Sequence, residues 1–350
     1  MKNIYWSIIC VISLCASCRQ PDSEEIDSFE VVKNIVDFDS IYSDKNSPSG
    51  IITAIDIFGH IIITKHGDDE QFFSFIDVKN GSLLRKWGNR GKGRNEYIRL
   101  GAGFSINDSA LVFLDEVKQE VNYVPIKEVL DSTELQIKKV PYPYTRDFRP
   151  FHMIMMGKWK IAVGGVSDGR FGMLDSLGQI VHCGFDYPFD IPDEINGIYR
   201  GVVFQSQIKS SQKQSKFVLH VIYSDIFEIY EIKDRKLYRM YVSPFNHVPQ
   251  IKEARNMNRY ALDSGKNIVG LTKMAVSDNL IAFLYSTDLC RSFREGTQQL
   301  NTVLCFDWNG NKIAKYILPV AVNGFCIDSE YIYGYRYDGD ETIFYRFKMT

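Results

Sequence analysis

A strand–turn–strand unit recurs along this chain at roughly 40–50 residue intervals, and this repeat constrains the fold more than any other feature. Three of the turns look alike, because each begins with an aspartate and ends with a glycine. They are Asp77–Gly81, Asp175–Gly178 and Asp307–Gly310. An asparagine precedes the glycine in two of them, and Asn-Gly supplies the positive φ angles of tight hairpins. A repeated hairpin unit of this length predicts the blades of a β-propeller.

Six such units can be counted in the sequence, and the last is one strand short. The run Phe29–Phe38 is β-prone and stands alone before the first unit, so it could supply the missing strand. A single blade cannot bury both of its faces, and stability therefore requires neighbours around the axis. The sequence predicts an all-β, six-bladed β-propeller over residues 29–350, closed by an N-terminal strand.

The composition agrees with this fold. Hydrophobic residues make up 45% of the chain and charged residues 24%, which is typical of a globular protein. Aromatic residues reach 13%, and together with many Ile and Val they favour strands over helices. The net charge of -2 gives no overall attraction to nucleic acid, so we expect no nucleic-acid partner.

The N-terminus reads as a processing signal. Lys2 precedes an apolar run, Ile4–Leu14, which is shorter than the roughly 20 residues needed to span a bilayer. Small residues then lead into Cys18, and this resembles a bacterial lipobox. We expect a signal peptide over residues 1–17, lipidation of Cys18, and a polar, acidic tether over residues 18–28. Cleavage of an ordinary secretory signal near Ala16 is the alternative.

These features predict an outer-membrane lipoprotein that faces the periplasm or the cell surface, with the membrane as a partner through its anchor.

Four cysteines remain after the signal: Cys183, Cys290, Cys305 and Cys326. A disulfide is possible in an exported protein. However, their spacing fits no metal motif, and three of them lie in apolar strands, so we expect small buried core residues.

The candidate ligand site is the glycine-rich, basic stretch that follows the first unit. Its residues are Arg90, Lys92, Arg94, Glu96 and Tyr97. With the neighbouring arginines and lysines they could accept an anionic ligand such as an acidic glycan. The stretch lacks the Gly-Lys-Ser/Thr ending of a phosphate loop, and Glu96 occupies the third glycine position of a dinucleotide loop. In the structural alternative, the glycines permit tight turns between blades and Glu96 pairs with a nearby arginine.

Three stretches resemble one family, the TolB-like six-bladed β-propeller lipoproteins of Gram-negative gut bacteria. They are Trp87–Tyr97 (WGNRGKGRNEY), Tyr199–Gly201 with the strands after it, and Phe306–Asn311 (FDWNGN). The first departs from the family pattern, since Arg94 and Asn95 stand where the family has Pro-Gly. The resemblance covers nearly the whole mature chain and implies the fold. It implies no established activity.

Other motifs carry no assignable chemistry. Gly165–Gly169 matches G-x-S-x-G, but the segment after it reads as a strand, whereas a nucleophile elbow needs a helix there. The acidic turns His66–Glu70 and Asp338–Glu341 lack the spacing of a calcium loop. The six histidines are scattered, although a propeller can gather distant residues at its axis. We therefore assign no catalytic residue, metal or cofactor.

Two segments interrupt the repeat, and such loops often carry a propeller's binding surface. Pro244–Asn267 has apolar residues at helical spacing after Pro249, which predicts a short inserted helix, and Ile191–Arg200 predicts a smaller one. Aromatic residues near predicted loops could stack on sugars or peptides, or fill the gaps between blades. They are Tyr142, Tyr144, Phe148, Phe151, Tyr187 and Phe189.

The sequence thus predicts a binding or scaffolding module for a protein or glycan partner. The alternative is a propeller enzyme, a polysaccharide lyase or glycosidase, with its active site at the axis. That enzyme would require paired carboxylates, or a histidine with a base or a metal, to meet there.

Overall fold

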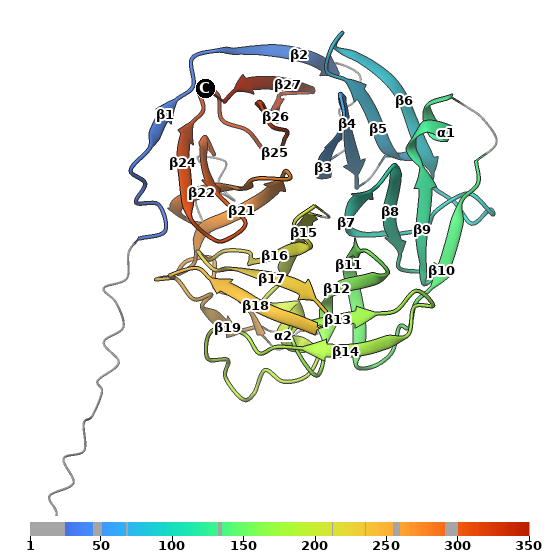
Figure 1. Ribbon diagram of the computed structural model, residues 1–350, viewed down its shortest axis with the longest axis vertical. Helices are drawn as coiled ribbons and strands as arrows, with labels where there is room; N and C mark the ends of the chain where they lie inside the picture. Colours follow the sequence, from blue (N-terminus) through green and yellow to red (C-terminus); the bar gives the residue numbers. More distant parts are fainter. Residues whose placement is uncertain are drawn as a thin grey trace, which may run out of the picture.

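The computed structural model describes residues 25–44, 51–67, 69–131, 135–211, 213–234, 236–254, 260–290 and 300–349. The predicted signal peptide 1–17 and Cys18 lie outside these ranges, as does most of the tether. The described residues form six sheets arranged as blades around a central axis, seen from one end in Figure 1. The predicted six-bladed β-propeller is confirmed.

Each blade has four antiparallel strands. They are given below in their order within the blade, from the innermost strand at the axis to the outermost. Blade 1 contains β3 (Ile52–Phe58), β4 (Ile61–His66), β5 (Gln71–Asp77) and β6 (Ser82–Asn89); blade 2 contains β7 (Leu100–Asn107), β8 (Ala110–Asp115), β9 (Glu120–Pro125) and β10 (Lys138–Pro141). Blade 3 contains β11 (Phe148–Met156), β12 (Trp159–Val166), β13 (Phe171–Leu174) and β14 (Ile180–Gly184); blade 4 contains β15 (Ser206–Ser211), β16 (Lys216–Val221), β17 (Phe227–Lys233) and β18 (Lys236–Val242). Blade 5 contains β21 (Ile268–Val276), β22 (Ile281–Leu289), β23 (Thr302–Phe306) and β24 (Lys312–Ile317); blade 6 contains β25 (Gly324–Ile327), β26 (Tyr331–Asp338), β27 (Glu341–Lys348) and β2 (Phe38–Asp44).

The N-terminal segment closes the ring, but with a later strand than the sequence predicted. The outermost strand of blade 6 is β2, which pairs antiparallel with β27 from Phe38 opposite Phe347 onward. The predicted run Phe29–Phe38 instead contains β1 (Val32–Asn34), a fifth strand that lies parallel to β24 of blade 5. The physical reason is that Phe29 packs edge-on against Phe306, which holds this run on blade 5 before the chain crosses to blade 6.

The two ends of the ring differ in their connections. One end, here the crossover face, carries the loops from each outermost strand to the next blade, together with the loops between second and third strands. The other end, the turn face, carries the tight turns between first and second and between third and fourth strands. Helix α1 (Ile126–Asp131), which the sequence did not predict, lies on the turn face, and α2 (Tyr199–Val203) lies on the crossover face.

The three predicted Asp–Gly turns occupy the same place, between the third and fourth strands of blades 1, 3 and 5. In each turn the aspartate Oδ1 accepts a hydrogen bond from the backbone N–H two residues ahead. The donors are Lys79 to Asp77 at 2.8 Å, Leu177 to Asp175 at 2.9 Å and Asn309 to Asp307 at 2.8 Å. The glycines have positive φ, as the turn requires: Gly81 +65°, Gly178 +84° and Gly310 +89°.

These glycines also allow each turn to touch the preceding blade. A Cβ on Gly81 would lie 2.0 Å from the carbonyl oxygen of Ile41 in β2, and one on Gly178 would lie 2.3 Å from that of Pro141 in β10. The turn glycine is therefore fixed by contact with the neighbouring blade as well as by its own backbone angle.

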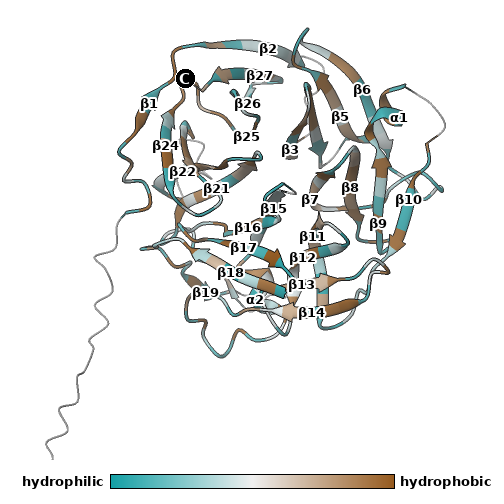
Figure 2. Ribbon diagram, in the orientation of Figure 1, coloured by the Kyte–Doolittle hydropathy of each residue, from teal (hydrophilic) through white to brown (hydrophobic). Residues whose placement is uncertain are grey.

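The core consists of apolar layers between blades, and Figure 2 shows brown, hydrophobic segments along the strands of the blades. Aromatic rings fill much of this space; Phe73 and Phe113, on blades 1 and 2, have ring centroids 5.0 Å apart. Of the loop aromatics, Tyr142 and Phe148 are buried, Phe151, Tyr187 and Phe189 are half-buried, and Tyr144 is exposed. The expected burial of the cysteines is confirmed for Cys290, Cys305 and Cys326, whereas Cys183 is only half-buried.

The predicted helix in Pro244–Asn267 is wrong for the part of this segment that the structure describes. That part contains a two-stranded hairpin, β19 (Ile251–Glu253) and β20 (Tyr260–Leu262). The Asn267 side chain accepts from the Gln250 N–H and donates to its carbonyl oxygen, which joins the ends of the hairpin. The helix predicted in Ile191–Arg200 is replaced by turns, and α2 begins only at its end. No helix among the described residues has the length and apolarity to cross a bilayer.

Candidate functional site

A cavity of about 140 Å³ lies at the centre of the ring, between the innermost strands of all six blades. Its polar lining comes from Thr53, Gln205, Ser206, Gln207, Lys209 and Lys273, and its aromatic lining includes Phe104, Phe151 and Phe325. None of the described residues that line it is Asp or Glu. Gln205 and Ile222 lie at the crossover ends of their strands, so the cavity extends towards the crossover face.

An ion pair crosses the axis of the propeller. Lys209 Nζ, on β15 of blade 4, donates to Asp56 Oδ2 on β3 of blade 1, the blade opposite. The side chains are 14% and 18% exposed. Since Lys209 also lines the cavity, its charge there is already balanced by Asp56.

The second lysine of the cavity, Lys273 on β21, has no such balance. Burial lowers the pKa of its ammonium group, and the ammonium has no ion-pair or hydrogen-bond partner among the described residues. Removal of a charge from water without a partner is costly. Lys273 therefore leaves one uncompensated positive charge at the cavity.

His152, on β11, places a neutral imidazole beside the same space. It is 6% exposed, and its ring packs on Gly103, where a Cβ would lie 2.6 Å away. Burial, and then the positive charge of Lys209, lower its pKa to about 3, so the ring is neutral at pH 7. Its Nε2 atom is buried and has no hydrogen-bond partner among the described residues.

The predicted loop residues come together, but away from the axis, in the crossover between β6 and β7. Arg90 lies against the loop from β4 to β5, where its guanidinium donates to the carbonyl oxygens of Gly67 at 2.6 Å and Asp69 at 3.3 Å and stacks 4.2 Å from the Phe72 ring. Tyr97 is fully buried between blades 1 and 2. These two side chains are thus held by contacts inside the protein.

Of the other three loop residues, Glu96 is half-buried and contacts its own turn. Glu96 Oε2 accepts the Gly93 N–H at 2.8 Å across the turn, while Lys92 and Arg94 are exposed. Lys118 supports the loop from blade 2 by donating to the carbonyl oxygens of Gly93 and Glu96. Glu96 thus bonds to the backbone of its own turn, whereas the sequence suggested an arginine partner. Ligand binding by this loop stays a prediction.

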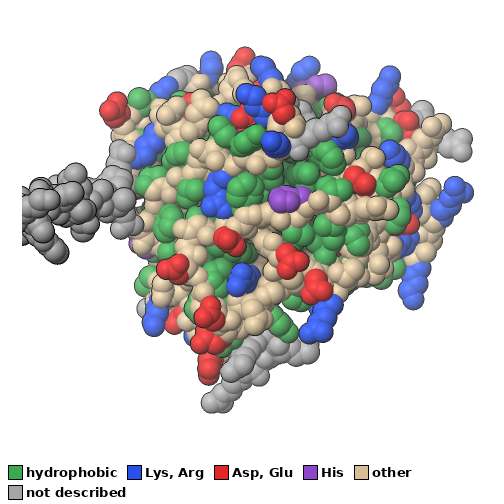
Figure 3. Space-filling view, turned by 60° about the horizontal axis from the view of Figure 1, so that its bottom comes forward, with side chains coloured by type: hydrophobic (Ala, Val, Ile, Leu, Met, Phe, Trp, Pro, Cys, Tyr) green, Lys and Arg blue, Asp and Glu red, His purple; other side chains and the backbone are tan. Residues whose placement is uncertain are grey.

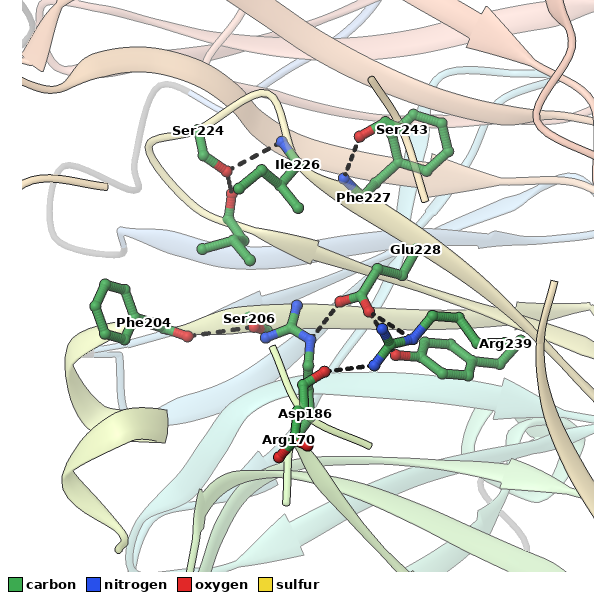
Figure 4. A network of polar contacts seen from close by, with 12 residues as sticks. Arg170, Asp186, Phe204, Ser206, Ser224, Ile226, Phe227, Glu228, Arg239 and Ser243 are labelled. Carbon is green, nitrogen blue, oxygen red and sulfur yellow. Dashed lines mark hydrogen bonds and ion pairs between the residues drawn. The ribbon is translucent and has the colours of Figure 1, made fainter. Parts of the chain in front are cut away.

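A buried charge network joins blades 3 and 4 (Figure 4). The Glu228 carboxylate accepts from Arg170 Nε, with both side chains fully buried, and Arg239 Nε lies 3.3 Å from its other oxygen. Tyr230 donates to Glu228 at 2.6 Å, and the Arg170 guanidinium lies 4.5 Å from the Tyr187 ring centroid. No local feature of the sequence indicates this network, because Arg170 and Glu228 are 58 residues apart.

A Ser–His–Asp arrangement occurs in blade 1. Ser74 Oγ lies 2.9 Å from His66 Nε2, and His66 Nδ1 lies 3.4 Å from Asp69 Oδ2. Thr64 shares the same Nε2 atom at 3.0 Å, and both hydroxyl residues are buried. The adjoining cavity measures about 10 Å³ and cannot admit a substrate. This set therefore links strands β4 and β5, and it lacks the accessible nucleophile that a hydrolase triad requires.

The G-x-S-x-G motif also lacks the geometry of an elbow. Its Ser167 lies in the loop between β12 and β13, where Oγ donates to Asp147 Oδ1 at 3.1 Å. A strand follows, as the sequence predicted. Ser167 lines an open, polar groove of the crossover face with Asp168, Asn196 and Tyr199. No group of three or more His, Cys, Asp or Glu side chains among the described residues is placed to hold a metal.

The rim of blades 3 and 4 presents apolar side chains on its outermost strands. In Figure 3 hydrophobic side chains gather across the middle of this side of the ring, with charges of both signs around them. Ile180 and Val181 on β14 are 38% and 48% exposed, and Tyr238 and Met240 on β18 are 43% and 51% exposed.

Comparisons with known proteins find this architecture in one protein family and in several solved structures. A protein-family model described as TolB-like 6-blade propeller-like matches residues 33–330. One similar solved structure is a member of the DUF4221 family from Bacteroides vulgatus ATCC 8482, with 10% identity, coverage of 91% of this chain and 98% of that chain, and a TM-score of 0.58. Another is a protein from Bacteroides fragilis NCTC 9343 described as exported, with 12% identity, coverage of 95% and 93%, and a TM-score of 0.51.

No curated protein matches the sequence. The two solved structures share the fold at identities too low to carry an activity. The family model, however, spans most of the chain, and it agrees with the six blades that the described residues form. This protein belongs to the TolB-like six-bladed propeller family.

Proposed function

We propose that this protein is a glycan-binding module of the bacterial envelope, and that it holds the end of its ligand in the axial cavity. The observation that carries the proposal is the lining of that cavity. Gln205, Ser206 and Lys273, which carry amide, hydroxyl and ammonium groups, line it together with the aromatic residues Phe104 and Phe151. Such a set can hydrogen-bond sugar hydroxyl groups and pack on the apolar side of a sugar ring.

The size of the cavity favours a ligand that enters end-on. Pockets for drug-sized ligands measure about 300–1,000 Å³, and this cavity measures about 140 Å³. It has room for a terminal group of a chain, while the rest of the ligand lies across the crossover face. The described parts of the insertions, residues 185–205, 243–254 and 260–267, would border that path.

Location in the envelope is supported by the N-terminal sequence and by the B. fragilis relative described as exported. Glu25 lies on the turn face, where its carbonyl oxygen accepts from Lys312 Nζ at 3.0 Å. A tether from Cys18 to Glu25 can reach at most roughly 25 Å. A lipid on Cys18 would therefore hold the turn face towards the outer membrane and leave the cavity open on the opposite side.

The alternative function, a lyase or glycosidase, has less support. Glycoside hydrolysis needs two carboxyl groups at the reacting bond. The described lining of the cavity contains no Asp or Glu, and the carboxylate of Asp56, on the innermost strand of blade 1, is paired with Lys209. Binding without turnover fits this arrangement better.

A glycan array with neutral and acidic oligosaccharides tests the proposal. Ala102 is exposed and lines the cavity, so Ala102→Trp should obstruct it, whereas Leu177→Trp changes an exposed site on the turn face. We expect the wild type and Leu177→Trp to bind the same glycans and Ala102→Trp to lose them. The proposal fails if the wild type binds no glycan, or if Ala102→Trp binds as well as the wild type.

A further inference from the structure

We propose that the axial cavity selects sugar acids, that is, ligands that carry both a carboxylate and hydroxyl groups, and that Lys273 pairs with the carboxylate while His152 contacts a hydroxyl group. The inference rests on the proposed function and adds the chemical class of the ligand. It concerns the axis, and it is independent of the basic loop between β6 and β7.

The first step is the charge of the cavity. Two ammonium groups line it, and the described lining contains no carboxylate. Asp56 balances Lys209 across the axis. One positive charge, that of Lys273, is left for a ligand to balance. A neutral ligand would leave this charge buried and uncompensated, whereas a carboxylate would pair with it.

The second step is the unused hydrogen-bonding atom of His152. A buried polar atom without a partner is uncommon in proteins and needs an explanation. A neutral imidazole Nε2 either donates or accepts, according to its tautomer. A hydroxyl group can do both, so a sugar hydroxyl can satisfy His152 Nε2 in either tautomer, which a carboxylate can do in only one.

The third step is the placement of the two groups. Lys273 is on β21 of blade 5 and His152 on β11 of blade 3, so blade 4 lies between them around the ring. Gln205, Ser206 and Gln207 of blade 4 line the cavity in that interval and supply further amide and hydroxyl groups. A ligand with its acid at one side and its hydroxyls at the other matches this order.

Isothermal titration calorimetry with glucuronate, galacturonate and the matching neutral sugars provides the test. A charge-assisted hydrogen bond typically contributes enough free energy for about a tenfold to hundredfold change in affinity. We expect the wild type to prefer at least one acid over its neutral partner by that factor. Lys273→Gln should abolish the preference, and Lys273→Arg, which keeps the charge, should retain part of it.

Lys213→Gln is the matched control, because Lys213 is 62% exposed on the turn face and pairs with Asp278 there. It should bind the acid as the wild type does. His152→Phe should weaken acid and neutral sugars by the same factor, since it removes a contact to a hydroxyl. The inference is overturned if acid and neutral sugars bind equally, if Lys273→Gln keeps the preference, or if no sugar acid binds. In the first two cases the binding module itself survives, while the absence of any glycan binding on the array would remove both proposals.

Discussion

The two faces of this ring are held together in different ways. On the turn face each Asp–Gly turn is closed by a local polar contact, as in the Asp77 turn, where the carboxylate accepts from the backbone two residues ahead. On the crossover face the contacts join distant segments. Asp225 accepts from the N–H groups of Asn246 and His247, and Lys118 ties down the loop at Gly93 and Glu96.

This difference helps to tell residues that maintain the fold from residues that are available to bind a ligand. A local turn can be repeated in several blades because each copy needs only its own residues and the blade beside it. The long-range contacts of the crossover face differ from one place to the next, because each joins residues far apart in the sequence. At the axis, Lys273 Nζ and His152 Nε2 have no partner among the described residues, and that is why the axial cavity stands out as the candidate site.

The largest effect is expected from Glu228→Gln, which removes the carboxylate that links blades 3 and 4. Arg170 and Arg239 would then both lose the negative charge with which they pair, and the Arg170 side chain is fully buried. Loss of one partner of a buried pair typically costs about 3–5 kcal/mol. Urea unfolding measures the loss in unfolding free energy. A loss below about 1 kcal/mol would mean that long-range ion pairs do not hold the crossover face together.

A smaller loss is expected from Gly81→Ala on the turn face. The new Cβ would meet the Ile41 carbonyl oxygen of β2, and φ is +65°, so we expect a loss of roughly 2–4 kcal/mol from overpacking and backbone strain. Gly59→Ala is the control in the same blade and on the same face. Its φ is +60° and nothing lies within 4 Å, so it should cost only about 1–2 kcal/mol. Equal losses would show that contact with the ring-closing strand contributes nothing.

The dependence of folding stability on pH tests whether His152, at the axis, is buried and neutral in the folded protein. The pKa of His152 is about 3 in the folded protein, because of burial and the charge of Lys209, and about 6.5 in the unfolded chain. Between these values the unfolded state binds the proton and the folded state does not, so stability falls as the pH is lowered. The contribution is about 1.4 kcal/mol per pH unit.

His152→Gln should reduce the slope of unfolding free energy against pH by that amount between about pH 4 and 6, measured in urea at several pH values. His220, whose pKa burial also lowers to about 3, keeps its own contribution in the variant. An unchanged slope would show that His152 is accessible to protons in the folded state.

The smallest effect is expected from Asp39→Asn, which breaks the exposed pair between Asp39 and Arg346 in blade 6. Their shortest contact is 2.8 Å, but the side chains are 51% and 32% exposed. Exposed pairs contribute about 0–1 kcal/mol. Measured by the same urea unfolding, Asp39→Asn is the control for Glu228→Gln. A loss of unfolding free energy as large as that of Glu228→Gln would contradict the distinction between buried and exposed ion pairs.

The sequence predicted the features that depend on neighbouring residues. The Asp77, Asp175 and Asp307 turns could be read directly, because aspartate and glycine act within each turn. The sequence predicted that an N-terminal strand closes the ring, but it identified Phe29–Phe38 as that strand, since the contact of Phe29 with Phe306 is not visible in the sequence. The helix proposed in Pro244–Asn267 failed for a similar reason. Its spacing fitted a helix, while the bonds between Gln250 and Asn267 favour a hairpin.

The candidate site could not be predicted. Lys273 and His152 belong to different blades, and each looks like an ordinary strand residue in the sequence. Arg90 and Tyr97 had the stronger sequence signal, yet their side chains are held by Gly67 and by the core between blades 1 and 2. Only the closed ring brings the innermost strands together and shows which charges are left without partners.

The most direct test of the account is a crystal structure of the protein with the sugar acid that binds best. We predict electron density for the acid in the axial cavity, with its carboxylate within hydrogen-bonding distance of Lys273 Nζ and a hydroxyl near His152 Nε2. Density for the acid over the loop of Lys92 and Arg94, with an empty axial cavity, would contradict the account and restore the basic loop as the binding site.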